Sequence, residues 1–263
     1  MVALNLAVSP RWACRTGPRP SVRWHSQPFV KYLVCLALAL AAPAAPAALF
    51  EDTMAQRMLA CSACHGKEGR AGPDGYYPRI AGKPAGYLYN QLLNFRDGRR
   101  RYGLMARLLN PLSDAYLLEI ARHFASLELP YPPPRRADAA AALLERGAAV
   151  VRRGDPAAGL PPCTECHGER LTGVAPNIPG LLGLPRDYLN AQLGAWRAGQ
   201  RQAHAPDCMA QIARRLPAAD LTAATAWLAA QPVPADASPA ASLPQPPSIA
   251  CGSAVLPAGR PRP

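Results

Sequence analysis

Three segments between residues 49 and 130 carry apolar side chains every three to four positions, which is the spacing of one helix face. The first covers residues 49–60, the second begins at Pro84, and the third follows Ser113, a residue type that caps helix N-termini. Because helices usually end before a proline, the third should stop before Pro130. The pattern predicts an all-α module over residues 49–130. Its apolar faces are Phe50, Met54 and Met58; Tyr87, Leu88, Leu92 and Phe95; and Leu117, Ile120, Phe124 and Leu127.

The same pattern returns further along the chain and predicts a second, duplicated all-α module over residues 138–231. Tyr87 corresponds to Tyr188, 101 positions later. At the same distance, Leu88, Gln91, Leu92 and Phe95 correspond to Leu189, Gln192, Leu193 and Trp196. Residues 131–137 include three consecutive prolines and are expected to form a stiff linker. The chain is therefore predicted to hold two tandem helical domains.

Each predicted module contains one Cys-x-x-Cys-His run. These runs are Cys61, Cys64 and His65 in the first module, and Cys163, Cys166 and His167 in the second. Two thiols three positions apart can each form a thioether with a haem vinyl group, and the adjacent imidazole then lies beneath the iron. The alternatives are zinc knuckles and thioredoxin-like redox pairs, which do not need the adjoining histidine. The runs predict two covalently bound haem c groups.

Each module also has a methionine at a repeated position between its last two helices. Met105 lies seven residues before Leu112, and Met209 lies seven residues before Leu216. A thioether sulfur from a loop at this place can supply a sixth ligand, which raises the reduction potential and closes the iron to substrates. Packing in the core is the alternative role for a methionine. The repeat favours the ligand role, with His65 and His167 as the opposite ligands.

On these residues the chain resembles the dihaem c-type cytochromes of the cytochrome c4 kind, which consist of two class I cytochrome c domains. The resemblance covers residues 49–230 and includes both attachment runs, the two Tyr-Leu-x-x-Gln-Leu helices and the downstream methionines. It implies a carrier without catalytic residues that relays single electrons through two His/Met-ligated haems. The implied partners are redox proteins: a dehydrogenase or quinol-oxidising complex as donor, and an oxidase or reductase as acceptor.

The resemblance also implies a proline carbonyl that fixes each histidine ring through the ring N–H that does not face the iron. Pro78 and Pro176 match that position, because residues 78–82 and 176–180 share the pattern Pro-x-Ile-x-Gly, 98 positions apart. Small changes in loop length would account for the difference between this repeat distance of 98 residues and the 101 residues from Tyr87 to Tyr188.

An enzyme is the alternative to a carrier: a thiosulfate dehydrogenase-like or peroxidase-like protein, or a subunit of one, with an open or thiolate-ligated haem. Cys208 precedes Met209, and a thiolate ligand there would lower the potential of the second haem. Cys208 and Cys251 are the cysteines that remain after the predicted signal and the attachment runs are set aside. A disulfide between them suits an oxidising compartment, and the sequence leaves this pairing open.

Residues 1–48 are typical of an export signal. Four arginines precede Lys31 and an apolar stretch over residues 32–42, and small residues follow up to an expected cleavage near Ala47 or Ala48. This predicts a periplasmic protein; membrane association through an uncleaved signal is the alternative. Removing the signal lowers the net charge from +12 to +7, because it holds five basic and no acidic residues, so nucleic-acid binding is not implied.

A basic cluster surrounds the first methionine and is expected to steer an acidic partner, with a solvated face as the alternative. Its members are Arg96, Arg99, Arg100, Arg101 and Arg107. The end of the chain, residues 232–263, is rich in Pro, Ala and Ser. It has too few large apolar side chains to offset the cost of ordering, so a tail that is disordered or lies loosely on the surface is expected.

Overall fold

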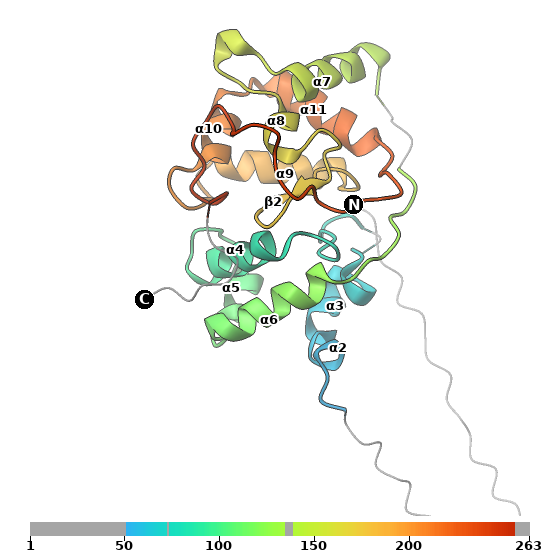
Figure 1. The fold of residues 1–263 in the computed structure, drawn as a ribbon, viewed down its shortest axis with the longest axis vertical. Helices are drawn as coiled ribbons and strands as arrows, with labels where there is room; N and C mark the ends of the chain where they lie inside the picture. The colour runs from blue at the N-terminus through green and yellow to red at the C-terminus, as the bar shows by residue number, and fades with distance from the viewer. Residues whose placement is uncertain (1–50, 73, 135–138, 256–263) are drawn as a thin grey trace, which may run out of the picture. The chain divides into compact units, whose positions relative to one another are not determined.

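The computed structural model describes residues 51–72, 74–134 and 139–255. These residues belong to one compact unit, Glu51–Pro263, which contains both predicted modules. In this described part, Figure 1 shows helices joined by loops and one small sheet. The predicted signal over residues 1–48 and the linker residues 135–137 lie outside the described residues. No helix of the described part is long and apolar enough to cross a membrane.

The first module contains the predicted helices, but the one predicted for residues 49–60 is divided at Met58, and residues 103–109 form a helix where a loop was predicted. Its elements are α2 (Met54–Arg57), α3 (Leu59–His65), the 3-10 turn η1 (Lys67–Gly69), α4 (Ala85–Arg96), α5 (Gly103–Leu109) and α6 (Asp114–Ala125). The helix expected from residue 49 begins at Met54, because the Thr53 side chain caps it by accepting from the Gln56 N–H. Ser113 caps α6 as predicted, with its hydroxyl accepting from the Tyr116 N–H at 3.3 Å.

The second module repeats this order of helices, with a longer helix before its attachment run and with two short strands. Its elements are α7 (Ala141–Arg153), the 3-10 turn η2 (Pro156–Ala158), α8 (Cys163–His167), β1 (Gly173–Val174), β2 (Ile178–Pro179), α9 (Arg186–Arg197), α10 (Cys208–Arg215) and α11 (Ala218–Ala230). Strand β1 pairs antiparallel with β2. Helix α11 packs on α7 and α9 (Figure 1). A side chain at Gly147 of α7 would lie 2.2 Å from the Ala223 carbonyl oxygen, so this close crossing requires glycine.

Each module has its own apolar core. In the first, the predicted α6 face is buried: Leu117 is fully buried, and Ile120 and Phe124 are 4% and 2% exposed. These side chains pack with Leu88 and Leu93 of α4, which fixes α4 against α6. The core of the second module centres on its own closing helix, α11, and includes Val151, Leu189, Ala224, Trp227 and Leu228. In each module, the helices that follow the attachment run therefore pack together in the module's own apolar core.

The tail differs from the expected disorder, because residues 232–255 lie along the second module (Figure 1). Ala240 bridges to β1: the Ala175 N–H donates to its carbonyl at 2.8 Å, and its own N–H donates to the Gly173 carbonyl at 2.9 Å. Asp236 forms an ion pair with Arg170 at 3.0 Å. The prediction of disorder counted only large apolar side chains, whereas backbone pairing and ionic contacts attach this tail.

Candidate haem-binding sites

The first attachment run lies on α3 and ends at a buried histidine. Cys61 is half-buried, Cys64 is exposed, and His65 is 9% exposed. Ring atom Nδ1 of His65 lies 2.9 Å from the carbonyl oxygen of Pro78. Since a carbonyl only accepts, Nδ1 carries the proton and Nε2 keeps its lone pair for a metal. Burial also lowers the pKa of His65, which favours the neutral ring that a metal needs. Pro78 is the expected acceptor.

The second run lies on α8, and His167 is buried at its end. Its Nδ1 lies 2.7 Å from the carbonyl oxygen of Pro179, so the assignment of this role to Pro176 is wrong. The carbonyl that accepts from Nδ1 must lie 12 or 13 residues after the histidine, at the end of the loop that follows it. Pro78 is 13 residues from His65 and Pro179 is 12 from His167, whereas Pro176 is only nine residues beyond His167. The Pro176 carbonyl instead accepts from the Tyr87 N–H at 3.0 Å, which links the two modules.

The thiols of the runs lack the environment of reactive or zinc-binding cysteines. Burial raises the pKa of Cys163 and of Cys166 to about 11, and it raises the pKa of Cys61 as well. A redox pair or a zinc site needs thiolates, which a lowered pKa favours. Within the described residues, no three side chains of His, Cys, Asp and Glu come together to hold a metal ion. The zinc-knuckle and redox-pair alternatives therefore have no support here.

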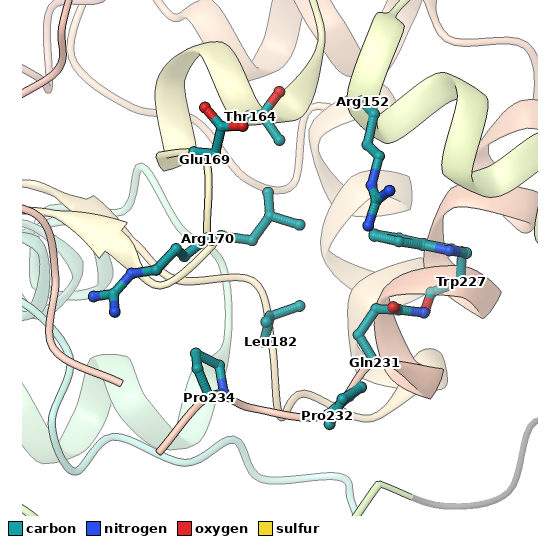
Figure 2. A pocket seen from close by; sticks show the side chains of 10 residues that line it. Arg152, Thr164, Glu169, Arg170, Leu182, Trp227, Gln231, Pro232 and Pro234 are labelled. Atoms are coloured by element: carbon teal, nitrogen blue, oxygen red, sulfur yellow. The ribbon is translucent and has the colours of Figure 1, made fainter. Parts of the chain in front are cut away.

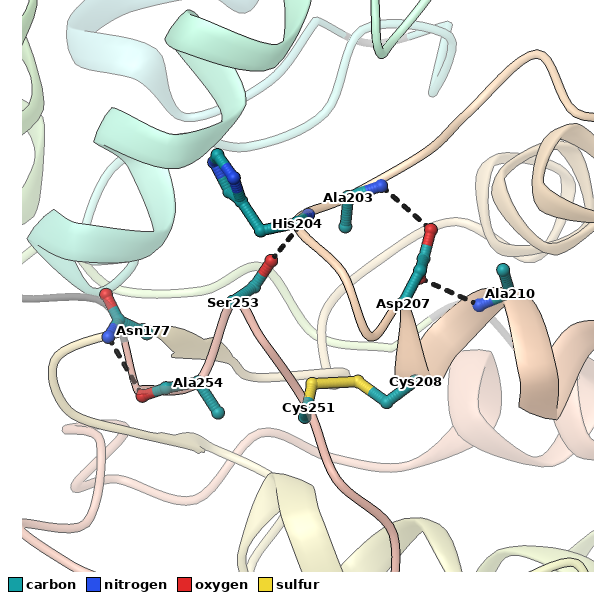
Figure 3. Close-up of a disulfide and its surroundings, with 9 residues drawn as sticks. All are labelled: Asn177, Ala203, His204, Asp207, Cys208, Ala210, Cys251, Ser253 and Ala254. Carbon is teal, nitrogen blue, oxygen red and sulfur yellow. Dashed lines mark hydrogen bonds between the residues drawn. A yellow bond between two sulfur atoms is a disulfide. The ribbon is translucent and has the colours of Figure 1, made fainter. Parts of the chain in front are cut away.

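The two methionines lie in helices and not in the loops that the sequence suggested. Met105 is the third residue of α5, and Met209 is the second residue of α10. Asp207 starts α10, because its carboxylate accepts from the Ala210 N–H at 3.0 Å and from the Ala203 N–H at 2.8 Å (Figure 3). Met105 borders the first core cluster, which Cys61 also touches. Met209 packs against Trp196, Ala210 and Ala213.

Cys208 forms a disulfide with Cys251 from the tail (Figure 3). The bond joins residues 43 positions apart and ties the tail to the first turn of α10. It resolves the pairing that the sequence left open. With both sulfur atoms engaged, Cys208 offers no thiolate to a metal.

The surroundings of Met209 fit a haem. The indole Nε1 of Trp196 is buried and has no hydrogen-bond partner within the described part of the chain. A buried N–H donor in native protein normally has an acceptor. It lies in the same cluster as Met209, and a haem propionate is an acceptor of the right chemistry. The donor set of each module, two thiols, an imidazole nitrogen and a thioether, matches covalent haem c with two axial ligands.

An arginine pair that the sequence reasoning missed joins the two modules. Arg100 donates to Tyr188 and Gln192 of the second module at 3.1 and 2.6 Å. Arg201, which is 5% exposed, donates to Tyr87 and Gln91 of the first module at 3.4 and 3.0 Å. Burial lowers the pKa of Arg201, and the nearby Arg100 adds to the effect. Arg100 and Arg201 are 101 residues apart, the same distance as Tyr87 and Tyr188. This repeat in the sequence could have identified the arginine pair.

The basic cluster predicted around Met105 is only partly free to meet a partner. Arg96 forms ion pairs with Asp97 and Asp114 at 3.2 and 2.6 Å, and Arg99 pairs with Asp97 at 2.7 Å. Arg100 is engaged between the modules. The remaining two members of the cluster, Arg101 and Arg107, are exposed.

A cavity of about 270 Å³ lies between α7, α8, α11 and the start of the tail (Figure 2). Its lining includes Thr164, Glu169 and Arg170 but neither His167 nor Met209. Arg152 lies over the Trp227 ring at 5.1 Å, as Figure 2 shows, and Arg170 pairs with Asp236. These contacts account for its arginines, and we assign the cavity no role in haem binding.

Two known proteins are similar to this chain over most of their own length. The thiosulfate dehydrogenase electron acceptor of Thiomonas intermedia (strain K12) is 39% identical over 198 residues, which cover 75% of this chain and 88% of that protein. Cytochrome c4 of Pseudomonas aeruginosa is 33% identical over 203 residues, which cover 75% of this chain and 97% of that protein. This chain belongs to the cytochrome c4 family of dihaem c-type cytochromes. No family model matches it.

Solved structures agree with this family. Reduced cytochrome c4 from Pseudomonas stutzeri superposes with a TM-score of 0.56 at 29% identity and covers 66% of this chain and 95% of that chain. Thiosulfate dehydrogenase (TsdBA) from Marichromatium purpuratum gives a TM-score of 0.59 at 32% identity, over 67% of this chain and 37% of that chain. The chain thus spans well under half of the TsdBA chain. As a member of the family, the protein is an all-α dihaem electron-transfer protein with two covalently bound haem c groups.

Proposed function

We propose that each haem is held by the attachment run of its module, with one histidine and one methionine as axial ligands. In the first module, Cys61 and Cys64 carry the thioethers, and His65 and Met105 bind the iron. The Pro78 carbonyl supports this role for His65, because it holds the protonated Nδ1 and leaves Nε2 for the metal. The apolar cluster that Met105 and Cys61 both border favours a dry, six-coordinate site.

In the second module, Cys163 and Cys166 carry the thioethers, and His167 and Met209 bind the iron. The Pro179 carbonyl holds His167 in the same tautomer. Bound haem supplies reversible one-electron chemistry, while these side chains set the potential and keep ligands and substrates away from the iron. Two closed sites of this kind serve transfer of electrons and not catalysis on a substrate.

The protein therefore acts as a carrier and not as an enzyme, and one observation supports this choice above the others. Cys208 is the side chain that could have turned the second haem into a thiolate-ligated catalytic site, and its sulfur is engaged by Cys251. Met209, the next residue in the sequence, then supplies the sulfur ligand of the second haem. A closed haem with thioether sulfur has a raised potential, which suits an electron acceptor.

The donor that we propose is a thiosulfate-oxidising haem enzyme in the periplasm. The similarity to the thiosulfate dehydrogenase electron acceptor of Thiomonas intermedia, at 39% identity, supports this choice, as does the likeness to TsdBA. Export to the periplasm is expected from residues 1–48 and is typical of the family. Two haems allow the protein to take up two electrons one at a time before it passes them to an oxidase or reductase.

The proposal is tested by mixing the purified ferric protein with thiosulfate and following haem absorbance. The protein alone should stay oxidised, and it should become fully reduced when a catalytic amount of a thiosulfate dehydrogenase is added. A mixture of that enzyme and ferric protein without thiosulfate is the control. Reduction by thiosulfate alone would contradict the carrier role, and failure to be reduced with the enzyme present would contradict the proposed donor.

A further inference from the structure

The tail is fastened to the second module at two points that are close in sequence. The Glu165 carboxylate accepts from the backbone N–H and from the hydroxyl of Ser248, both at 2.6 Å. Three residues later, Cys251 is bonded to Cys208. We call residues 248–254 the edge strap. Three residues of extended chain span at most about 10 Å, so the strap runs directly from one anchor to the other.

The two anchors belong to opposite sides of the second site. Glu165 lies between Cys163 and Cys166 on α8, two residues before His167, whereas Cys208 adjoins Met209 on α10. Axial ligands approach an iron from opposite faces of the haem. The strap links the attachment run to the start of α10 and would therefore pass beside the thioether edge of a haem bound between them.

Further contacts hold the strap against the methionine side of the site. The Gly252 N–H donates to the Pro206 carbonyl at 2.9 Å. Figure 3 shows the His204 N–H donating to the Ser253 hydroxyl, at 3.3 Å. The approach at Gly252 is close, because a Cβ there would lie 2.2 Å from the Ala205 carbonyl oxygen. The Asn177 side chain donates to the Ala254 carbonyl at 3.0 Å. The strap is a packed part of the second module.

The first module has apolar residues where the strap is anchored in the second. Through the duplication, Ala63 corresponds to Glu165 and Leu104 to Cys208. Neither side chain can accept a hydrogen bond or form a disulfide. Ala63 is exposed, and Leu104 is 54% exposed. The two modules therefore present different surfaces at equivalent places.

We propose that the edge strap closes the second haem edge to redox partners, so that partners dock on the first module around Ala63 and Leu104. The inference rests on the proposed haem ligation and adds a site of electron entry and exit. The partner that fits is a protein with an acidic rim around an apolar patch. Leu104 and the 61% exposed Tyr76 supply the apolar contact, and the exposed Arg101 and Arg107 supply the positive rim.

The first test measures the access of solvent to each haem. A neutral gadolinium chelate is added to the ferric holoprotein, and the broadening of the haem methyl NMR signals is compared between the two haems. We expect the first haem to be broadened and the second to be protected. The double variant Cys208→Ser/Cys251→Ser should lose this protection. Glu165→Ala, which removes the other anchor and leaves the disulfide intact, should lose part of it.

The second test measures docking with reduced flavodoxin, an acidic one-electron donor, by stopped flow. Leu104→Glu places a negative charge on the proposed surface and should slow reduction by about tenfold at low salt. Val255→Glu is the matched control, since Val255 is an 81% exposed apolar residue of the tail beyond the strap, and it should leave the rate unchanged.

Equal gadolinium broadening of both haems in the wild-type protein would overturn the proposed shielding. An unchanged rate for Leu104→Glu, or a slower rate for Val255→Glu, would overturn the proposed docking surface. These outcomes differ from a failure of the proposed haem ligation. Such a failure would appear first in the haem content and axial ligands of the wild-type protein, which are measured by mass and by optical spectrum before either test.

Discussion

Arg100 and Arg201 lie opposite each other at the contact between the modules, and both guanidinium groups bind the same two side chains, Gln91 and Gln192. Their backbones are also bridged: the Arg101 N–H donates to the Gln200 carbonyl at 2.8 Å, and the Gln202 N–H donates to the Arg99 carbonyl at 2.7 Å. The contact repeats the duplication of the chain, with each arginine reaching into the other module. Neutral amide oxygens thus hold two cations in a largely buried place.

We predict that Gln192→Leu lowers the free energy of unfolding by about 2 kcal/mol, because it removes an acceptor shared by two guanidinium groups and leaves their donors unsatisfied. Guanidinium chloride unfolding of the holoprotein, followed by circular dichroism, measures the change. Gln202→Leu is the control, since Gln202 is exposed, and it should alter the stability by less than about 0.5 kcal/mol. Equal stabilities of the two variants would argue against the shared network.

Removing a methionine ligand should open one haem and leave the other closed. Met105→Ala and Met209→Ala should each allow one imidazole to bind per protein, with a lower potential for the haem that is affected. Cys208→Ser should bind none, because its sulfur is engaged with Cys251. Imidazole titration followed by absorbance counts the open sites. Binding to Cys208→Ser but not to Met209→Ala would assign the sixth ligand to Cys208.

The disulfide should stabilise the second module. Mass spectrometry of unreduced, alkylated protein should find no free thiol at Cys208 or Cys251. Their replacement by Ser should lower the stability by about 2–4 kcal/mol, because the bond closes a loop of more than 40 residues in the unfolded chain. Labelling of either cysteine by the alkylating reagent would contradict the pairing.

Electrostatic steering should depend on the exposed part of the basic cluster. We predict that Arg101→Glu/Arg107→Glu slows reduction by flavodoxin and weakens its dependence on ionic strength, because long-range attraction between charges is screened by salt. Arg197→Glu/Arg214→Glu makes the same change of charge at two exposed arginines of the second module and should have little effect. If both variants lose rate equally, net charge and not this cluster determines the rate.

The sequence predicted the features that local chemistry determines. The attachment runs need only thiols and an imidazole at fixed spacing, and the helix faces need only their period, so both modules were found. The loop after the histidine was misaligned, because two short Pro-x-Ile-x-Gly segments matched by chance at 98 positions. Gly82 and Gly183 both have a φ of +70°, and Pro78 and Pro179 both accept from a histidine ring, so the equivalent positions are 101 residues apart. The sequence contains this register as well, because Pro84 and Pro185 are also 101 positions apart.

The remaining errors concern contacts that depend on the folded surface. The tail has few large apolar residues, and nothing in its composition predicts that Ala240 pairs with β1 or that Ser248 meets Glu165. Arg201 was not selected from the sequence, although its contacts with the first module follow the 101-residue repeat. The contacts of the tail, unlike those of the two arginines, have no repeat in the sequence that could reveal them.

The carrier role requires two His/Met-ligated haems in one chain, and near-infrared magnetic circular dichroism of the ferric wild-type protein tests this most directly. This method separates His/Met, His/Cys and high-spin haem by the position of the charge-transfer band, and its intensity counts each type. We predict a His/Met signal that accounts for two haems per chain. A signal for one His/Met haem together with a thiolate-ligated or high-spin haem would contradict the carrier.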